Sequence, residues 1–439
     1  MIEQNVRKIA LRLFTEWETG DRFINLVLED KAVACLSQED KRFLTALLYG
    51  TVERLITLDY VILCLAHRPA RDMAPHTRRL LRLGLYQLLY MDSVPAFAAV
   101  NETVALAGSR GERGFVNAIM RAALRSPEAY ALPDREKDPE TYLSLAHAFP
   151  RSVVRLLCRQ YGEEMCEAML ARFNETQPLT LRVNTTKTDR ATLLRTLRDA
   201  GYEAEETPYA PTGIRLGGSA NPADLPGFNE GLFYVQDEAS QIAVAALDAR
   251  GAAMTVDTCA CPGGKSFGAA MDMGGTGEVL SFDLHDSKLP LIISGAARLG
   301  LANIRAAVHN GEEADPALYH RADRVLCDAP CSGMGVLGKK ADLRHRAGDR
   351  EALPPLQKRI LTASATYVKP GGVLVYSTCT LNRAENEDVC HAFLAENPAF
   401  RPEPFSVGSL NAPDGMLTLL PPVHRTDGFF IAKFVRIDV

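Results

Sequence analysis

The sequence lacks any apolar run that approaches the ~18 residues of a membrane-spanning helix. Its first ten residues mix charged with apolar side chains, unlike a secretory signal peptide. Internal repeats and low-complexity segments are also missing. Hydrophobic residues make up 47% and charged residues 23% of the 439-residue chain, as in ordinary soluble proteins. We therefore expect a cytoplasmic protein of two or three domains, without a membrane partner.

Cysteine is sparse, with ten residues, and in a chain without a secretory signal we expect them to be reduced. Because free cysteine packs readily in protein cores, we interpret six of them as core residues: Cys35, Cys64, Cys158, Cys166, Cys327 and Cys390. A zinc site is the alternative for the remaining cysteines. The usual Cys-x₂-Cys pair is missing, and Cys-x-Cys and Cys-x₃-Cys fit zinc poorly, so we expect no metal.

The net charge of −5 is no argument for a nucleic-acid partner, but binding depends on local patches rather than on the sum. Basic residues gather in three stretches, each of which could be a solvated face or a phosphate contact. The first contains Arg68, Arg71, Arg78, Arg79 and Arg82, the second Arg110, Arg113, Arg121 and Arg125, and the third Lys339, Lys340, Arg344 and Arg346.

The first 128 residues show the apolar spacing of helices, and the polar, proline-containing stretch 129–141 indicates a linker. Residues 142–235 predict a small α+β subdomain, with a helix at 151–173, a strand at 179–184, a helix at 191–200 and a strand at 231–235.

From about residue 236 strands and helices alternate, which predicts an open parallel α/β sheet covered on both faces. The expected strands are 254–258, 278–284, 304–309, 324–328 and 372–377, and the expected helices are 265–273, 287–299, 356–368 and 385–396. The tail, 429–435, is expected to add an antiparallel edge strand. Ligands of such sheets bind at the carboxyl ends of the strands.

A glycine turn follows the first of these strands, where Gly263 and Gly264 open a helix. Such a turn lets a ligand approach the backbone and presents free N–H groups. The phosphate-loop and three-glycine dinucleotide patterns both fail here. Asp283, at the end of the next strand, stands where a carboxylate grips a ribose diol. A nucleoside without phosphates, such as S-adenosylmethionine, fits these residues; a plain tight turn beside a solvent-facing aspartate is the alternative.

Two cysteines follow the ends of apolar strands, Cys331 after Asp328 and Cys379 after 372–377. Carbon 5 of cytosine is a poor nucleophile, but a thiolate that adds to carbon 6 makes it reactive towards a sulfonium methyl group. This chemistry needs a thiol, an acidic group near ring N3 and a base for the carbon-5 proton. Asp328 and Cys331 are spaced to share one loop. The alternative is a pair of buried cysteines.

These motifs resemble those of RNA cytosine-5 methyltransferases of the Sun/RsmB (Fmu) type, which act on small-subunit ribosomal RNA. Asp257–Lys265 resembles the donor-binding motif, Asp328–Gly333 the first thiol motif, and Thr378–Thr380 with Glu385–Glu387 the second. Other parts are similar to the NusB-type RNA-binding domain, the small RNA-recognition-like subdomain and the entry to the catalytic core. The first likeness rests on 82–89, 94–95, 101–102 and 115–118, the second on 181–185 and the third on 235–240.

The resemblance implies a Rossmann-like S-adenosylmethionine methyltransferase core at 236–439. An all-α NusB-like domain (1–128), the linker (129–141) and a small α+β RNA-recognition-like subdomain (142–235) would precede it. It also implies roles for individual residues. Cys379 would be the nucleophile, Cys331 would assist release of the RNA adduct, and Asp328 would contact both the target cytosine and the donor. Lys265 would reach the catalytic centre. The donor would be wrapped by Cys259, Ala260, Cys261, Pro262, Gly263, Gly264 and Lys265, with Asp283 on its ribose and Asn310, or else Glu312, near its adenine.

The function expected from the sequence is therefore S-adenosylmethionine-dependent methylation of carbon 5 of a cytosine in small-subunit ribosomal RNA, through a covalent cysteine adduct, by a monomer. One alternative is a transfer RNA cytosine-5 methyltransferase with the same chemistry. Another is an RNA-binding antitermination or assembly factor with an inactive methyltransferase half. Retention of both thiols, Asp328 and the glycine turn disfavours the latter.

Overall fold

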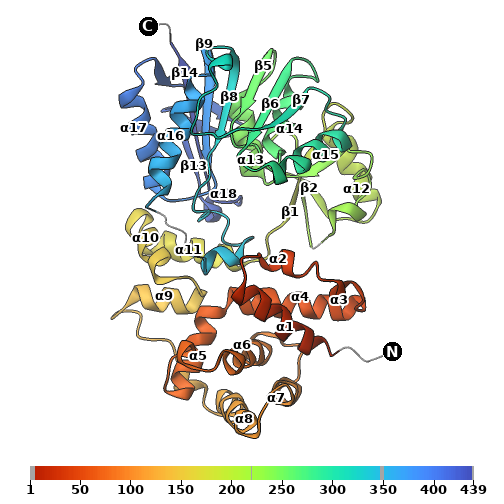
Figure 1. The fold of residues 1–439 in the computed structure, drawn as a ribbon, viewed down its shortest axis with the longest axis vertical. Coiled ribbons are helices and arrows are strands. Elements are labelled where there is room, and N and C mark those ends of the chain that lie inside the picture. The colour runs from red at the N-terminus through yellow and green to blue at the C-terminus, as the bar shows by residue number, and fades with distance from the viewer. Residues whose placement is uncertain (1–4, 219, 347–350, 438–439) are drawn as a thin grey trace. The chain divides into compact units, whose positions relative to one another are not determined.

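The computed structural model describes residues 5–218, 220–346 and 351–437, and the chain divides into two compact units (Figure 1). The helical unit runs to Asn174 and also takes in Lys340–Arg346; the sheet unit holds Glu175–Lys339 and the chain after Arg346. Within the described ranges, no helix combines the length and apolar character needed to cross a membrane.

The helical unit packs amphipathic helices around one apolar core, which includes Phe14, Leu47, Leu81 and Met120. Prolines stand at helix starts, where a missing N–H costs nothing: Pro75 opens α6 and Pro95 is the N-cap of α7. The helices are α1 (Val6–Thr19), α2 (Ile24–Val27), α3 (Lys31–Ala34), α4 (Gln38–Glu53), α5 (Leu55–Ala66), α6 (Pro75–Tyr90), α7 (Ala96–Ala105), α8 (Arg110–Arg125), α9 (Pro139–His147), α10 (Arg151–Tyr161) and α11 (Glu163–Asn174), with 3-10 turns η1 (Ala70–Asp72), η2 (Pro127–Tyr130) and η6 (Ala341–Arg344).

Two local predictions in this unit are wrong. The helix expected over 151–173 is broken into α10 and α11 at Gly162, whose φ of 83° no helix interior accommodates. The stretch expected to be linker throughout, 129–141, contains the start of α9, because Pro139 is its first residue and Asp138 caps it.

Three arginines of the first basic stretch are engaged inside the helical unit. Arg78, Arg79 and Arg82 all pair with Glu18, and Arg82 also pairs with Asp59 at 2.7 Å. Burial raises the pKa of Glu18, but its hydrogen bonds and the arginine charges outweigh this, so the net pKa is lowered. The solvated face or phosphate contact considered for this stretch is therefore wrong for these three side chains, which form an internal ion-pair cluster.

The third basic stretch also serves the protein itself, because Lys340–Arg346 folds as part of the helical unit. Arg344 lies 3.9 Å from the ring centre of Phe149 and donates a 2.9 Å hydrogen bond to Asn174. Burial lowers the pKa of Arg344 to about 10. Asp342, 3% exposed, accepts hydrogen bonds from the Trp17 indole and the Ile24 backbone N–H.

The sheet unit begins with a small α+β subdomain. Its antiparallel sheet has the order β2-β3-β1-β4 and buries Leu181, Ile214 and Phe233 against α12 residues such as Leu197. The strands at 179–184 and 231–235 and the helix at 191–200 are confirmed, whereas β2 and β3 were not predicted. The elements are β1 (Leu179–Val183), α12 (Arg190–Asp199), β2 (Ala204–Glu206), β3 (Gly213–Leu216), η3 (Pro222–Asp224) and β4 (Phe233–Val235).

The main sheet has the strand order β10-β14-β9-β8-β5-β6-β7. Its strands β9, β8, β5, β6 and β7 are parallel and form the predicted α/β sheet. All five predicted strands and four predicted helices are present. They are β5 (Met254–Asp257), α14 (Gly264–Asp272), β6 (Glu278–Asp283), α15 (Leu289–Leu299), β7 (Ile304–Val308), β8 (Ala322–Asp328), α16 (Leu353–Ala365), β9 (Val368–Thr378) and α17 (Glu387–Glu396). The other elements are α13 (Glu238–Leu247), η4 (Asp286–Lys288), η5 (Pro316–Leu318), η7 (Arg383–Glu385), β10 (Phe400–Pro402), β11 (Phe405–Val407), β12 (Leu410–Ala412), β13 (Met416–Leu419), α18 (Pro421–His424) and β14 (Phe429–Arg436).

Helices cover both faces of this sheet, as near-continuous apolar strands require. In Figure 1, α16 and α17 lie on one side, and α14 and α15 on the other. The apolar cores on the two faces show the same arrangement. Leu361 of α16 and Phe393 of α17 belong to one core, and Ile242 of α13 and Ile292 of α15 belong to the other.

The C-terminal strand is antiparallel, as predicted, but it is not an edge. β14 pairs with β9 and also with β10 and β13, so it is an interior strand. Among the cysteines, Cys166, Cys327 and Cys390 are buried as predicted, whereas Cys35 is exposed and Cys64 and Cys158 are only half-buried. Cys35 directly follows the four-residue helix α3, where an apolar residue need not face the core.

Candidate active site

The three sequence motifs meet at one edge of the main sheet. β5 ends at Asp257, β8 at Asp328 and β9 at Thr378, and these strands are parallel neighbours in the order β9-β8-β5. The carboxyl ends of parallel strands are where ligands of open α/β sheets bind. The gathering of the motifs at this edge, which the topology predicts, is confirmed.

The two motif cysteines touch. Cys331 Sγ and Cys379 Sγ lie 3.3 Å apart, and both residues are half-buried. The hydrogen bond to Cys379 and burial both raise the pKa of the Cys331 thiol, which keeps Cys331 protonated at neutral pH. Two sulfur atoms in contact can share one proton. The pair can therefore hold Cys331 as a thiol and Cys379 as a thiolate.

A half-buried ion pair lies close to the Cys379 thiol. Lys265 Nζ lies 2.6 Å from Asp328 Oδ2, and the other oxygen of Asp328 accepts a 2.7 Å hydrogen bond from Ser377. Burial lowers the pKa of Lys265, but the charge of Asp328 outweighs it and the net pKa is raised. A Cys379 thiolate is among the charges that raise it. By the same attraction, the Lys265 ammonium favours a thiolate at Cys379.

The donor-motif residues form the turn between β5 and α14. Gly263, with φ of 107°, is the N-cap of α14, and a Cβ added there would stand 2.5 Å from the Phe267 ring. A side chain at this position is therefore excluded both by conformation and by space. A cavity of about 190 Å³ opens beside the turn and is lined by Val235, Gln236, Asp237, Ser240, Asp257, Cys259, Ala260, Cys261, Pro262, Gly264, Lys265 and Asp328.

The remaining predicted donor contacts lie at or just after the ends of the next two strands and are not among the residues that line this cavity. Asp283 ends β6, is 8% exposed, and accepts a 3.0 Å hydrogen bond from the His285 backbone N–H. Asn310 and Glu312 follow β7: the Asn310 amide donates to Glu313, and Glu312 pairs with Arg359 at 2.7 Å. Roles on the ribose and adenine stay predictions for all three.

One buried carboxyl in the site titrates near neutrality. Asp257 is 1% exposed, and burial raises its pKa to about 7. Its Oδ2 accepts a 2.6 Å hydrogen bond from Ser266, which in turn accepts one from Ser281. Sequence reasoning placed Asp257 in the donor motif but gave it no role of its own.

A second charged cluster, also without a predicted role, joins three loops near the cavity. Lys339 Nζ lies 2.6 Å from Asp237 and 2.9 Å from Asp427. Burial and the charge of Asp237 raise the pKa of Asp427 to about 7. Lys339 thus belongs to an internal cluster, and the phosphate contact considered for its basic stretch is wrong for this residue. Because Asp237 and Asp427 are far from Lys339 in the sequence, no local sequence pattern predicts this cluster.

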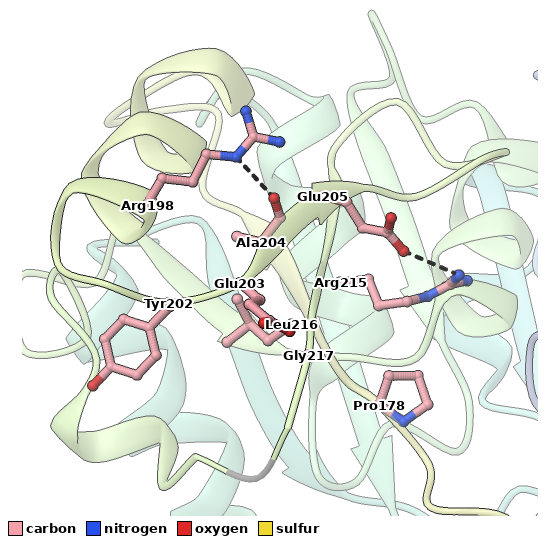
Figure 2. A pocket seen from close by; sticks show the side chains of 9 residues that line it. All are labelled: Pro178, Arg198, Tyr202, Glu203, Ala204, Glu205, Arg215, Leu216 and Gly217. Atoms are coloured by element: carbon pink, nitrogen blue, oxygen red, sulfur yellow. Dashed lines mark hydrogen bonds and ion pairs between the residues drawn. The ribbon is translucent and has the colours of Figure 1, made fainter.

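A larger cavity, of about 450 Å³, lies on the small subdomain beside β2 (Figure 2). Three of its charged side chains make local contacts: Arg198 donates to the Ala204 carbonyl at 2.8 Å, and Arg215 lies 3.6 Å from Glu205. The Arg198 contact also caps the free edge of β2, which protects that edge from pairing. None of the three motifs lines this cavity, so we assign it no chemistry.

Family models match most of the chain. The 16S rRNA methyltransferase RsmB/F model matches residues 244–435, the NusB family model residues 4–125, and the RsmF/B-like ferredoxin-like domain model residues 149–221. A crystal structure of PH0851 is similar with a TM-score of 0.80 and 25% identity over 98% of both chains. NSun6 from Pyrococcus horikoshii, solved with SFG, has a TM-score of 0.60 and 22% identity, covering 67% of this chain and 100% of its own.

Curated relatives match over their full length. A probable ribosomal RNA small subunit methyltransferase B from Synechocystis is 38% identical over 98% of this chain and 99% of its own. The protein of that name from Bacillus subtilis is 37% identical over 99% of both chains, and ribosomal RNA small subunit methyltransferase B from Klebsiella pneumoniae is 32% identical over 98% of both. With these identities and coverages, and with the motifs assembled at one sheet edge, the chain belongs to the RsmB/F family of 16S rRNA methyltransferases.

Proposed function

We propose that this RNA methyltransferase modifies carbon 5 of a cytosine in small-subunit ribosomal RNA, with Cys379 as a covalent nucleophile. Family membership makes the chain a methyltransferase that uses S-adenosylmethionine. The choice of ribosomal RNA follows the names of its full-length relatives. The choice of carbon 5 rests on one observation, the 3.3 Å contact between the sulfur atoms of Cys331 and Cys379 beside the Lys265–Asp328 ion pair.

The residues around the cavity fit this donor. The cavity lining includes three carboxyl groups, those of Asp237, Asp257 and Asp328, and the amino group of Lys265. A donor with a cationic sulfonium and a zwitterionic amino-acid end suits such a mixed lining. We assign the glycine turn at Gly263 to the close approach of the donor, and Cys259–Lys265 to its binding. Asp283 would hold the ribose, with Asn310 or Glu312 near the adenine.

The protein's own groups then divide the work. The Cys379 thiolate, favoured by Lys265, gives its electron pair to carbon 6 of cytosine and forms a carbon–sulfur bond. Asp328 holds the edge of the ring while carbon 5 becomes nucleophilic. When bound, S-adenosylmethionine supplies the methyl group that carbon 5 takes up.

Release needs one proton transfer and one bond cleavage. Carbon 5 then carries both the new methyl group and its original proton. A base removes this proton, and the freed electron pair expels the sulfur from carbon 6, which restores the ring and the thiolate. We assign assistance of this step to Cys331, because its sulfur touches that of Cys379. We propose further that the protein acts as a monomer in the cytoplasm.

Methyl transfer from labelled donor to small-subunit ribosomal RNA tests this function. The wild-type protein should label the RNA and protect one cytosine from bisulfite conversion, and Cys379→Ala should abolish both signals. Transfer to transfer RNA alone would support the other substrate class. Full activity of Cys379→Ala would remove the covalent mechanism.

A further inference from the structure

Four donors converge on the carboxylate of Glu385, a residue that is 0% exposed. Its Oε2 accepts from the Ser332 backbone N–H at 2.8 Å and from the Gln357 side-chain amide at 3.0 Å. Its Oε1 accepts from the Ser332 hydroxyl at 2.6 Å and from the Asn382 amide at 3.0 Å. A buried carboxylate with this many hydrogen-bond donors is held in one position.

The donors belong to the two loops that carry the thiols. Ser332 directly follows Cys331, and Pro330 directly precedes it. Gln357 also donates a 2.9 Å hydrogen bond to the carbonyl of Pro330. The backbone of Cys331 is therefore held on both sides. Asn382 lies three residues after Cys379, so the same carboxylate joins the loop of the second thiol to that of the first.

The neighbouring residue does the same for the other thiol. The Asn386 side chain accepts a 2.6 Å hydrogen bond from the Thr378 hydroxyl and donates a 3.0 Å hydrogen bond to the Thr380 carbonyl. Thr378 and Thr380 flank Cys379. The Ser332 and Thr380 hydroxyls, 2.8 Å apart, close the connection between the two loops.

We propose that Glu385 is a positioning residue that fixes the separation of the two thiols by holding the Cys331 loop against the Cys379 loop. It holds the two loops through its hydrogen bonds to Ser332 and Asn382. Loss of its charge weakens the hold on the Cys331 loop, while Asn386 continues to hold Cys379. As far as catalysis is concerned, this inference rests on the proposed function: attack by Cys379 persists, and release assisted by Cys331 slows.

The variant Glu385→Gln tests the proposal against Asp388→Asn, an exposed carboxylate close by at the start of α17. The first readout needs no RNA: a monosubstituted trivalent arsenical bridges two thiols at short separation, and peptide mapping reports the Cys331–Cys379 bridge. We expect the bridging rate to fall about tenfold or more in Glu385→Gln and to stay unchanged in Asp388→Asn, because reaction rates depend steeply on the placement of the reacting groups.

The second readout uses ribosomal RNA and labelled donor. Glu385→Gln should keep KM for the donor within about twofold, lower kcat by about 10- to 100-fold, and accumulate a protein–RNA adduct on a denaturing gel. If Glu385→Gln is too unstable to purify, Ser332→Ala, which keeps the backbone N–H contact, should show the same changes at smaller size.

Two results would overturn the proposal. The first is that Glu385→Gln, or its substitute Ser332→Ala, forms the bridge as fast as Asp388→Asn does. The second is that kcat falls without accumulation of the adduct, while methyl transfer still depends on Cys379. If Cys379→Ala itself transferred methyl groups, the proposed function would fail, and the bridging rates would still decide the role of Glu385.

Discussion

Lys265 Nζ and Asp328 Oδ2 lie 2.6 Å apart, between the donor turn after β5 and the first thiol loop after β8. The pair links the residue that follows the glycine turn to the residue that opens the thiol motif. Asp328 is fixed further by Ser377, near the end of β9. The ion pair and this hydrogen bond therefore connect the start of α14 to the ends of β8 and β9, which is where the proposed function places the donor and the target base.

Replacing Lys265 by Met should lower kcat by about 100-fold or more, because Cys379 loses the cation that favours its thiolate and Asp328 is left without its partner. Single-turnover methyl transfer over a pH series is the measurement. Lys265→Arg keeps the charge and should retain more activity than Lys265→Met at every pH. Equal losses in the two variants would argue that packing, not charge, is what Lys265 supplies.

The thiol pair makes an asymmetric prediction. Cys331→Ala should attack cytosine normally and then fail to release it, so that an RNA-linked band accumulates on a denaturing gel. Cys379→Ala should give no such band. The reverse assignment of bands would show that the roles of the two cysteines are exchanged.

Asp257 predicts a pH dependence of stability. Its pKa is raised by burial from 3.8 in the unfolded chain to about 7 in the folded protein. Between these values the unfolded chain is ionised and the folded protein is not, so the folded state holds more protons. The free energy of unfolding therefore falls as pH rises from about 4 to about 7 and is level above it.

The expected loss is on the order of 1–4 kcal/mol over that window. Asp257→Asn should remove this part of the pH dependence, because the amide does not ionise and its oxygen can still accept from Ser266. Urea unfolding of both proteins at pH 5 and pH 8 measures it. Parallel stability curves for the two proteins would contradict the assignment.

A glycine contact makes a steric prediction. The Gly335 backbone N–H donates to the Cys379 carbonyl at 2.9 Å, and a Cβ at Gly335 would stand 1.8 Å from the Gly428 carbonyl oxygen. Gly335→Ala should therefore displace the thiol loop and lower kcat by about 100-fold. Gly111→Ala is the matched control: it lies in α8 with open space around it and should keep full activity and gain up to about 1 kcal/mol of stability. Full activity of Gly335→Ala would rule out the tight contact.

Trp17, the single tryptophan, reports on the segment Lys340–Arg346. Its indole N–H donates to Asp342 at 2.6 Å, and the His345 ring stands edge-on to it at 6.2 Å. Asp342→Ala leaves two buried N–H donors unsatisfied and should cost about 2–5 kcal/mol, with a shift of tryptophan emission. Asp342→Asn keeps a hydrogen-bond acceptor and should change the stability and the tryptophan emission much less. Identical emission from Asp342→Ala and the wild type would contradict this contact.

The sequence predicts best where long, uniform patterns decide the structure. The apolar run that becomes β9 has Leu374, Val375 and Tyr376 at 0% exposure, and such runs identified every parallel strand. β2, Ala204–Glu206, is short and polar and owes its conformation to pairing with β3, so no local pattern reveals it. The interior place of β14 likewise depends on the short strands β10 and β13.

For the site, the motifs brought together Cys331, Cys379, Asp328 and Lys265, because strand ends can be read from the sequence. Partnerships between distant residues could not be read in this way. Nothing near Arg82 in the sequence announces Glu18, and nothing near Lys339 announces Asp237. Four basic side chains that look available for phosphate in the sequence are paired with carboxylates in the structure: Arg78, Arg79, Arg82 and Lys339.

The central claim is that the sulfur of Cys379 becomes bonded to carbon 6 of the target cytosine. Substrate RNA carrying 5-fluorocytidine at that position tests it most directly, because fluorine cannot leave as a proton does and the adduct persists. After nuclease and protease digestion, mass spectrometry should find the methylated nucleotide on the peptide that contains Cys379. A nucleotide on the Cys331 peptide, or methyl transfer to ordinary RNA by an enzyme that leaves no adduct with the fluorinated RNA, would contradict the account.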